Sequence, residues 1–161
     1  MRAPVVENNR CNCAALRKAS RRLSQLYDAA LASSGLKATQ FAILAEIERR
    51  QEAAPTMRDL ADALVMDQST IGQNLRPLER DGLIALVLDK ADRRRRHVTL
   101  TKHGRSRFAA ARPLWETAQT RFESHFGKQE AANLRAALST IAEAPMDPGP
   151  SWFSPRHESP R

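Results

Sequence analysis

A change of period in the middle of the chain constrains its fold more than any other feature. Up to Arg80 the apolar residues recur at the three- and four-residue spacing of amphipathic helices. From Ile84 the pattern becomes two short apolar segments, residues 84–88 and 97–100, which we expect to be strands. The residues between them, 89–96, include four successive arginines. Helices followed by a hairpin with a basic tip are the element order of a winged helix-turn-helix, so we expect a mainly α (α+β) fold of this kind.

Local signals indicate where the helices begin and end. Thr56 followed by Asp59 resembles a capping box. Asp67 suits the N-cap of the next helix, and Gly82 suits the position just after its end. Thr101 is a candidate cap for a long helix after the hairpin. We expect six helices, at about residues 11–33, 39–50, a third following Thr56, 69–80, 101–126 and 129–143.

The net charge restricts the class of partner. The formal charge is +8 at pH 7, and all of this excess lies in residues 1–107, because residues 108–161 hold six basic and six acidic side chains. A basic front part suggests a polyanion as its partner. Two cysteines near the N-terminus are no disulfide framework, and no apolar run is long enough to span a membrane. We therefore expect a cytoplasmic protein with no membrane partner.

The helix at residues 69–80 has two faces of different chemistry. On a helical wheel, Ile71, Leu75 and Leu78 fall on one side and should pack inward. The opposite side matches DNA, since Arg donates twice to guanine, Gln or Asn pairs with adenine, and hydroxyls suit phosphates or base edges. A plain solvated face is the alternative, and the turn before the helix and the hairpin after it favour DNA. The predicted contacts are Ser69, Thr70, Gln73, Asn74 and Arg76.

The arginine run at the hairpin tip is the second candidate DNA contact. A hairpin can place it over a phosphate ridge, and arginine also suits the negative potential of a narrow minor groove. Asp92 precedes the run and is a candidate to hold one guanidinium in position. A solvated charge run explains many such stretches, but four arginines between two apolar strands favour DNA. The predicted contacts are Arg93, Arg94 and Arg95, with Asp92 as their acidic neighbour.

Together these features resemble the MarR family. The resemblance covers about residues 11–143 and implies a homodimer in which each winged domain reads one half of a palindromic site. It also implies that Arg94 is the minor-groove arginine of the wing and that Asp92 is its partner. The implied partners are double-stranded DNA, a second copy of the chain, and a small-molecule effector or oxidant. The residues that carry the resemblance are Leu83-Ile84 after Asp81-Gly82, the wing Asp92-Arg93-Arg94, and Val98-Thr99-Leu100-Thr101 leading to Gly104.

The resemblance also divides the chain into parts. It implies dimerisation helices at residues 11–38 and 101–144, on either side of a winged helix-turn-helix DNA-binding domain at 39–100. Residues 1–10 are expected to be a flexible arm, and 145–161, with five of the nine prolines, a disordered tail. The predicted interface is apolar and larger than a small monomer easily covers, although intrachain packing is the alternative. Its residues are Leu16, Trp115, Phe122, Phe126, Leu134, Leu138 and Ile141.

Cys11 and Cys13 are the chemical oddity of the sequence. One intervening residue would strain a disulfide between them, whereas a helix N-terminus stabilises a thiolate. Cys13 resembles the redox cysteine of the family's organic-hydroperoxide-sensing repressors, and Tyr27 matches one of the two tyrosines that hydrogen-bond it there. The position of the other tyrosine is Ala38 here. Redox sensing by Cys11, Cys13 and Tyr27 is one hypothesis; inert cysteines and a bound aromatic or acyl ligand are the alternatives.

Other classes of function have less support in the sequence. No nucleophile-elbow, Walker, HExxH or paired-carboxylate pattern occurs, so we expect neither an enzyme nor a cofactor. Metal binding by the two cysteines, completed by dimer symmetry or by His97 or His103, has no supporting ligand spacing, and no metal site is expected. A protein-interaction or RNA-binding winged helix is the remaining alternative, although RNA readers usually present stacking aromatics that the candidate surfaces lack.

Overall fold

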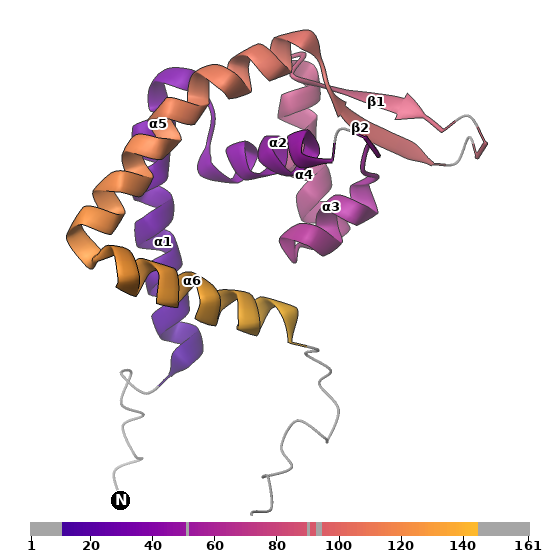
Figure 1. Cartoon of the computed structure of the whole chain (residues 1–161). Helices are drawn as coiled ribbons and strands as arrows, with labels where there is room; N and C mark the ends of the chain where they lie inside the picture. The colour runs from indigo at the N-terminus through magenta and orange to yellow at the C-terminus, as the bar shows by residue number, and fades with distance from the viewer. Residues whose placement is uncertain (1–10, 51, 90, 93–94, 145–161) are drawn as a thin grey trace, which may run out of the picture. The chain divides into compact units, whose positions relative to one another are not determined.

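The computed structural model describes residues 11–50, 52–89, 91–92 and 95–144. It is mostly helical, with one two-stranded antiparallel sheet, which confirms the expected fold class. Helix α4 begins one residue earlier than expected, at Gln68, because Asp67 is its N-cap. The elements shown in Figure 1 are α1 (Asn12–Leu31), η1 (Ala32–Ser34), α2 (Ala38–Arg49), α3 (Met57–Leu64), α4 (Gln68–Arg80), β1 (Ile84–Leu88), β2 (Arg96–Leu100), α5 (Lys102–Phe126) and α6 (Lys128–Glu143).

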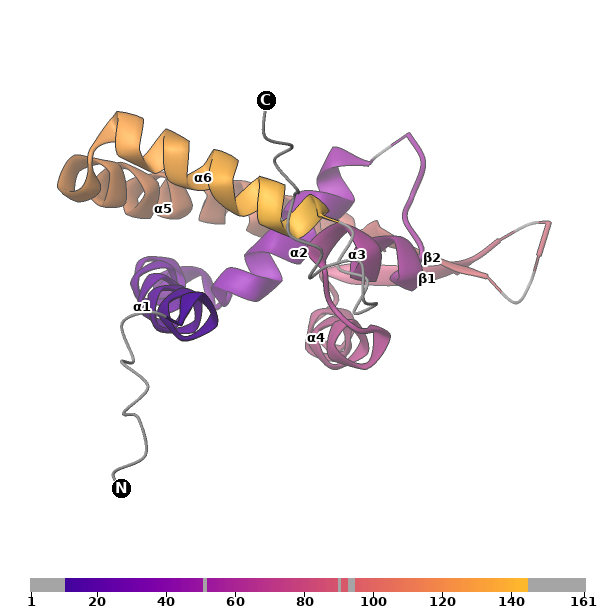
Figure 2. The same cartoon turned by 90° about the horizontal axis from the view of Figure 1, so that it is seen from below.

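The chain forms two compact units, which divide between Phe122 and Glu123. In the first unit, helices α2, α3 and α4 pack against one another and against the hairpin. Figures 1 and 2 both show strands β1 and β2 projecting from this helical cluster. The fully buried side chains that hold the cluster together come from every element of it, and they are Ile43, Leu44, Leu60, Ile71, Leu78 and Val98.

Aromatic side chains join α1 and α5 to this cluster within the first unit. The rings of Phe41 and Phe108 lie 5.0 Å apart, and Phe41 stacks on Trp115 at 5.8 Å. The Tyr27 hydroxyl of α1 donates a hydrogen bond of 2.5 Å to Gln119 of α5. Trp115, predicted to lie in the dimer interface, therefore also packs inside its own chain.

The second unit is a helical segment with its own internal contact. Arg135 of α6 donates a 3.1 Å hydrogen bond to Glu123, which lies in the last turn of α5. Ala131 is buried, whereas the side chains of Phe126 and Ile141 are 46% and 44% exposed. Among the described residues of both units, no helix is long and apolar enough to cross a membrane.

A glycine-dependent junction fixes the hairpin to the start of α5. The Thr101 hydroxyl donates to the Gly82 carbonyl at 2.6 Å and accepts from the Gly104 amide at 2.9 Å. Thr101 thus caps α5, as the sequence predicts. A Cβ atom at Gly104 would lie 1.8 Å from the Leu83 carbonyl oxygen. Only glycine lets the helix approach the backbone before β1 this closely.

We predict that Gly104→Ala lowers the free energy of unfolding by about 3 kcal/mol, because backbone atoms must move to admit the methyl group. Gly72→Ala is the matched control, since its Cβ would meet only the Met57 side chain, at 3.5 Å. The control should raise stability by up to about 1 kcal/mol, the usual gain when alanine replaces glycine within a helix. Denaturant unfolding measures both, and equal effects at the two positions would contradict the account of the junction.

Candidate nucleic-acid interface

Helix α4 presents the polar face that the sequence predicts. Ile71, Leu75 and Leu78 are buried, so the opposite side of the helix faces solvent. Ser69, Gln73 and Arg76 are exposed, and Thr70 and Asn74 are partly buried at the flanks. The structure therefore brings all five predicted contacts onto one helix, with three of them fully accessible.

The carboxylate of Asp67 organises the start of this helix. It accepts hydrogen bonds from the Ser69 hydroxyl at 2.5 Å, from the Thr70 amide at 2.7 Å, and from the Thr70 hydroxyl at 2.8 Å. These three donors, the Ser69 hydroxyl above all, lower the pKa of Asp67 to about 2. In this arrangement the hydroxyls of Ser69 and Thr70 point back to their own chain rather than outward.

Gln73 and Arg76 differ from their neighbours on the same face. Asn74 donates from Nδ2 to the Thr70 carbonyl at 2.9 Å, so its amide is engaged within the helix. Within the described part of the chain, neither Gln73 nor Arg76 has a hydrogen bond or ion pair to another side chain. Both are long, exposed and able to make two hydrogen bonds, which are the properties that major-groove recognition requires.

The hairpin 84–100, called the wing below, carries the second candidate contact. Arg95 and Arg96 are exposed, whereas Arg93 and Arg94 lie outside the described residues. Arg95 lies 3.9 Å from the Asp92 carboxylate, and its amide donates to the Asp92 carbonyl at 2.9 Å. Asp92 is thus close to one arginine of the run, whereas Arg94, which the resemblance implies as its partner, lies outside the described residues.

Asp89 and His97 form a contact in the wing that sequence reasoning missed. His97 Nε2 lies 2.8 Å from Asp89 Oδ2, and His97 Nδ1 lies 2.7 Å from the Ala54 carbonyl oxygen. The hydrogen bond from His97 lowers the pKa of Asp89 to about 2, with help from the amides of Asp92 and Ala91. The sequence offers one weak indication of this pair, namely an aspartate eight residues before a histidine across an expected hairpin turn.

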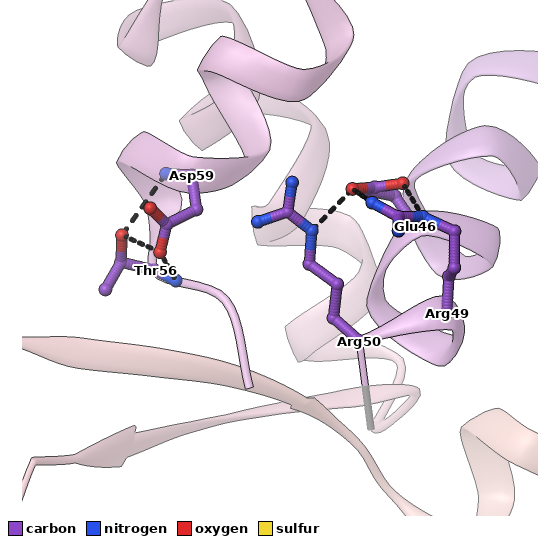
Figure 3. Close-up of polar contacts among 5 residues, drawn as sticks. All are labelled: Glu46, Arg49, Arg50, Thr56 and Asp59. Atoms are coloured by element: carbon purple, nitrogen blue, oxygen red, sulfur yellow. Dashed lines mark hydrogen bonds and ion pairs between the residues drawn. The ribbon is translucent and has the colours of Figure 1, made fainter. Parts of the chain in front are cut away.

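The connection between α2 and α3 is held by two polar clusters (Figure 3). Glu46 accepts from Arg49 at 2.7 Å and from Arg50 at 2.6 Å, and hydrogen bonding to Arg49 is the main cause of its lowered pKa. Thr56 and Asp59 form the predicted capping box, in which the Thr56 amide donates to Asp59 at 2.8 Å. Side-chain hydrogen bonds therefore hold both ends of the connection. Ala54, whose carbonyl oxygen faces His97, lies between these two ends.

The wing is tied to this connection by the backbone as well. The Val98 amide donates to the Pro55 carbonyl at 2.7 Å, and Thr56 pairs with His97 as an isolated antiparallel bridge. Strand β2 therefore pairs with β1 on one edge and with the segment before α3 on the other. The orientation of the wing relative to α3 and α4 is set along this edge.

The cysteines lie at the start of α1. Cys11 is the N-cap, where its Sγ accepts from the Ala14 amide at 3.4 Å, and both Cys11 and Cys13 are exposed. Tyr27, predicted to assist a redox cysteine, is hydrogen-bonded to Gln119 of its own chain. The described residues contain no cluster of His, Cys, Asp or Glu arranged to hold a metal ion.

The remaining predicted interface residues are distributed over both units. Leu16 of α1 is 38% exposed, and Phe122 of α5 is partly buried. Leu134 and Leu138 of α6 are partly buried as well. The role of these side chains in an interface between two copies of the chain stays a prediction.

Comparisons with known proteins agree with the fold. The model of the MarR family matches residues 34–95. The transcriptional activatory protein BadR of Rhodopseudomonas palustris is 34% identical over 62% of this chain and 54% of its own length. The chain thus spans about half the length of the curated relatives that it matches.

Two solved structures cover nearly the whole of their own chains. The transcriptional regulator MosR of M. tuberculosis, in complex with DNA, is 35% identical over 81% of this chain and 98% of its own, with a TM-score of 0.67. BpsR of Bordetella bronchiseptica, whose DNA binding is regulated by 6-hydroxynicotinic acid, is 26% identical over 88% of this chain and 99% of its own, with a TM-score of 0.75.

The role of Asp67 as a helix cap yields a prediction. Asp67→Ala removes the acceptor of the Thr70 amide, so the first turn of α4 should fray and the melting temperature should fall by about 2–4 °C. Asp67→Ser keeps a side-chain oxygen at the N-cap and should retain most of the stability. Thermal unfolding followed by circular dichroism measures the difference, and an equal loss in both variants would show that Asp67 stabilises the helix in some other way.

Proposed function

Because this chain belongs to the MarR family of winged-helix transcriptional regulators, we propose that it is a sequence-specific DNA-binding repressor. It binds a palindromic operator as a homodimer, and a small-molecule ligand or an oxidant releases it. Helix α4 of each protomer lies in the major groove of one half-site, and each wing contacts the adjacent backbone or minor groove. Repression follows from covering a promoter.

The observation that carries this proposal is the outer face of α4. Gln73 and Arg76 are exposed on the side opposite the buried Ile71 and Leu75. Their donors and acceptors are thus available for base edges at no cost in internal hydrogen bonds. DNA-bound MosR, which has the same fold and is 35% identical, supports the assignment of DNA as the partner.

The charge of the wing supports a contact with phosphates. Arg95 and Arg96 are exposed on the same hairpin as the two arginines of the run that lie outside the described residues. Each lysine or arginine that neutralises a phosphate releases a counterion, so affinity should fall steeply as salt rises. These contacts contribute affinity at every sequence, whereas α4 contributes the preference among sequences.

Exposed apolar side chains support a homodimer. Leu16 in the first unit and Phe126 and Ile141 in the second are each more than a third exposed. Large contiguous apolar patches mark protein contacts, and we infer that these side chains contribute to one. The family resemblance assigns that contact to a second copy of the chain, which also matches the two-fold symmetry of a palindrome.

The effector acts by changing how the two recognition helices are held. A ligand or an oxidant needs only a few kcal/mol of differential affinity for the DNA-free state to release the operator. BpsR is regulated by a small aromatic acid, which supports a ligand of that class. The exposed Cys13 near the N-terminus of α1 supports an oxidant instead. The two alternatives differ in their dependence on Cys13.

Selection of bound sequences from random duplex DNA, with the purified full-length chain, tests the proposal. One enriched palindrome is the expected result, with half-site centres about one helical turn apart. An unenriched pool, or equal affinity for RNA, would overturn the regulator assignment in favour of a protein-interaction or RNA-binding module. A reporter gene placed behind the palindrome then shows whether the protein lowers or raises transcription. Higher expression in the presence of the protein would contradict repression.

Substitutions in α4 and in the wing should change DNA affinity in different ways. Gln73→Ala or Arg76→Ala should cost about 1–3 kcal/mol on the best site and flatten the preference among sequences. Arg95→Ala should weaken binding to all sequences alike and reduce the slope of affinity against salt. Lys102→Ala is the matched control, because Lys102 is an exposed cation at the first position of α5, past the end of β2 that is opposite the wing turn. Fluorescence anisotropy over a salt series measures all four, and an unchanged salt slope in Arg95→Ala would contradict the wing contact.

Oxidation separates the two classes of effector. If an oxidant is the signal, organic hydroperoxide should abolish binding by the wild type and leave a Cys13→Ser variant bound. Cys11→Ser serves as the comparison, because Cys11 is equally exposed two residues away. Binding that is indifferent to peroxide in all three proteins would remove the redox alternative and leave a small ligand.

A further inference from the structure

Both ring nitrogens of His97 face oxygen acceptors. Nδ1 lies 2.7 Å from the backbone carbonyl oxygen of Ala54, and Nε2 lies 2.8 Å from Oδ2 of Asp89. A carbonyl oxygen only accepts hydrogen bonds. The other carboxylate oxygen of Asp89 accepts from the amides of Ala91, at 2.7 Å, and Asp92, at 3.0 Å, which favours the ionised form of Asp89. The histidine therefore lies between two acceptors.

Only the doubly protonated ring satisfies this arrangement. A neutral imidazole carries one N–H donor and one lone pair, so it can donate to Asp89 or to Ala54 but not to both. The imidazolium donates from both nitrogens at once, and its hydrogen bond to a carboxylate is of the stronger, charge-assisted kind. Loss of one proton leaves a nitrogen lone pair facing an oxygen, and one of the two contacts must open.

The two contacts join separate parts of the DNA-binding unit. Ala54 lies in the connection between α2 and α3, whose ends are fixed by the clusters of Figure 3. Asp89 is the first residue after β1, and its amide donates to the Arg95 carbonyl at 3.0 Å, which closes the wing turn. The arginine run starts within this turn. When both ring nitrogens are protonated, His97 therefore connects Asp89 of the wing turn to Ala54 of the α2–α3 connection.

We propose that the imidazolium form of His97 is a positioning group that holds the wing turn against the α2–α3 connection, so that affinity for DNA falls when this ring loses a proton. The proposal rests on the proposed function for its DNA readout. His97 touches no DNA in this account and acts through the arginines of the wing. Its loss of charge leaves the rest of the domain folded, because the Val98–Pro55 hydrogen bond and the Thr56–His97 bridge are made by the backbone.

The charged groups around His97 agree with this assignment. Asp89 on the wing and Asp59 on α3 are the acids that face it, and Arg58, Arg95 and Arg96 are the cations nearby, lining a shared hollow with Asp59. The hydrogen bond to Asp89, then that to Ala54, raises the pKa of His97 above its ordinary 6.5, against the burial of the ring, which lowers it. A group whose pKa is raised by folding stabilises the fold below its unfolded pKa, and this contribution is lost as the pH rises through the folded value.

The test is the affinity for the selected duplex between pH 6 and pH 9 at constant ionic strength, measured by anisotropy. We expect the wild type to lose about tenfold or more in affinity over this range, because each protomer loses one charge-assisted hydrogen bond. His97→Gln should bind at pH 6 as weakly as the wild type does at high pH and should show no midpoint. Asp89→Asn should shift the midpoint to lower pH, since it removes the carboxylate that holds the proton.

The matched control is His125→Gln, the same change at an exposed position in the last turn of α5, which should keep the midpoint of the wild type. A flat profile in the wild type, or an unchanged midpoint in His97→Gln, would overturn the proposal. The NMR titration of the imidazole nitrogens in the DNA-free protein keeps the two hypotheses apart. A chain that binds no duplex at any pH overturns the proposed function. A His97 ring that is neutral at pH 6 overturns the proposal that its imidazolium form joins the wing turn to the α2–α3 connection.

Discussion

Burial of one face of α4 is the constraint on which the rest of the structure depends. Ile71, Leu75 and Leu78 enter the core of the first unit, and their burial leaves no rotation of the helix that would hide Gln73 and Arg76. The Asp67 cap fixes where the helix begins and therefore which side chains lie in its first turn. The exposure of this polar face is thus a consequence of core packing.

The wing is positioned by contacts along the outer edge of β2 and at its base. Strand β2 pairs with β1 along its length and meets Pro55 and Thr56 on its other side. The junction at Gly104 brings α5 against the carbonyl of Leu83, which joins the hairpin to the long helix that follows it.

The sequence predicts what depends on neighbours along the chain and misses what depends on neighbours in space. The caps at Thr56, Asp67 and Thr101 and the two strands were recognisable because their signals span three or four residues. The link from His97 to Ala54 was missed, since 43 residues separate the two. The sequence also could not show that the hydroxyls of Ser69 and Thr70 point to Asp67, because a helical wheel gives the face of a residue and not its hydrogen bonds.

Chemical interference with dimethyl sulfate on the selected duplex tests the central claim, that α4 reads the major groove, most directly. The reagent methylates guanine N7 in the major groove and adenine N3 in the minor groove, so one experiment examines both grooves. The account predicts that methylated guanines within each half-site are excluded from the bound fraction, and that Arg76→Ala removes the exclusion at one guanine per half-site. Interference confined to adenines, unaffected by Arg76→Ala, would contradict it, because DNA would then be read without α4.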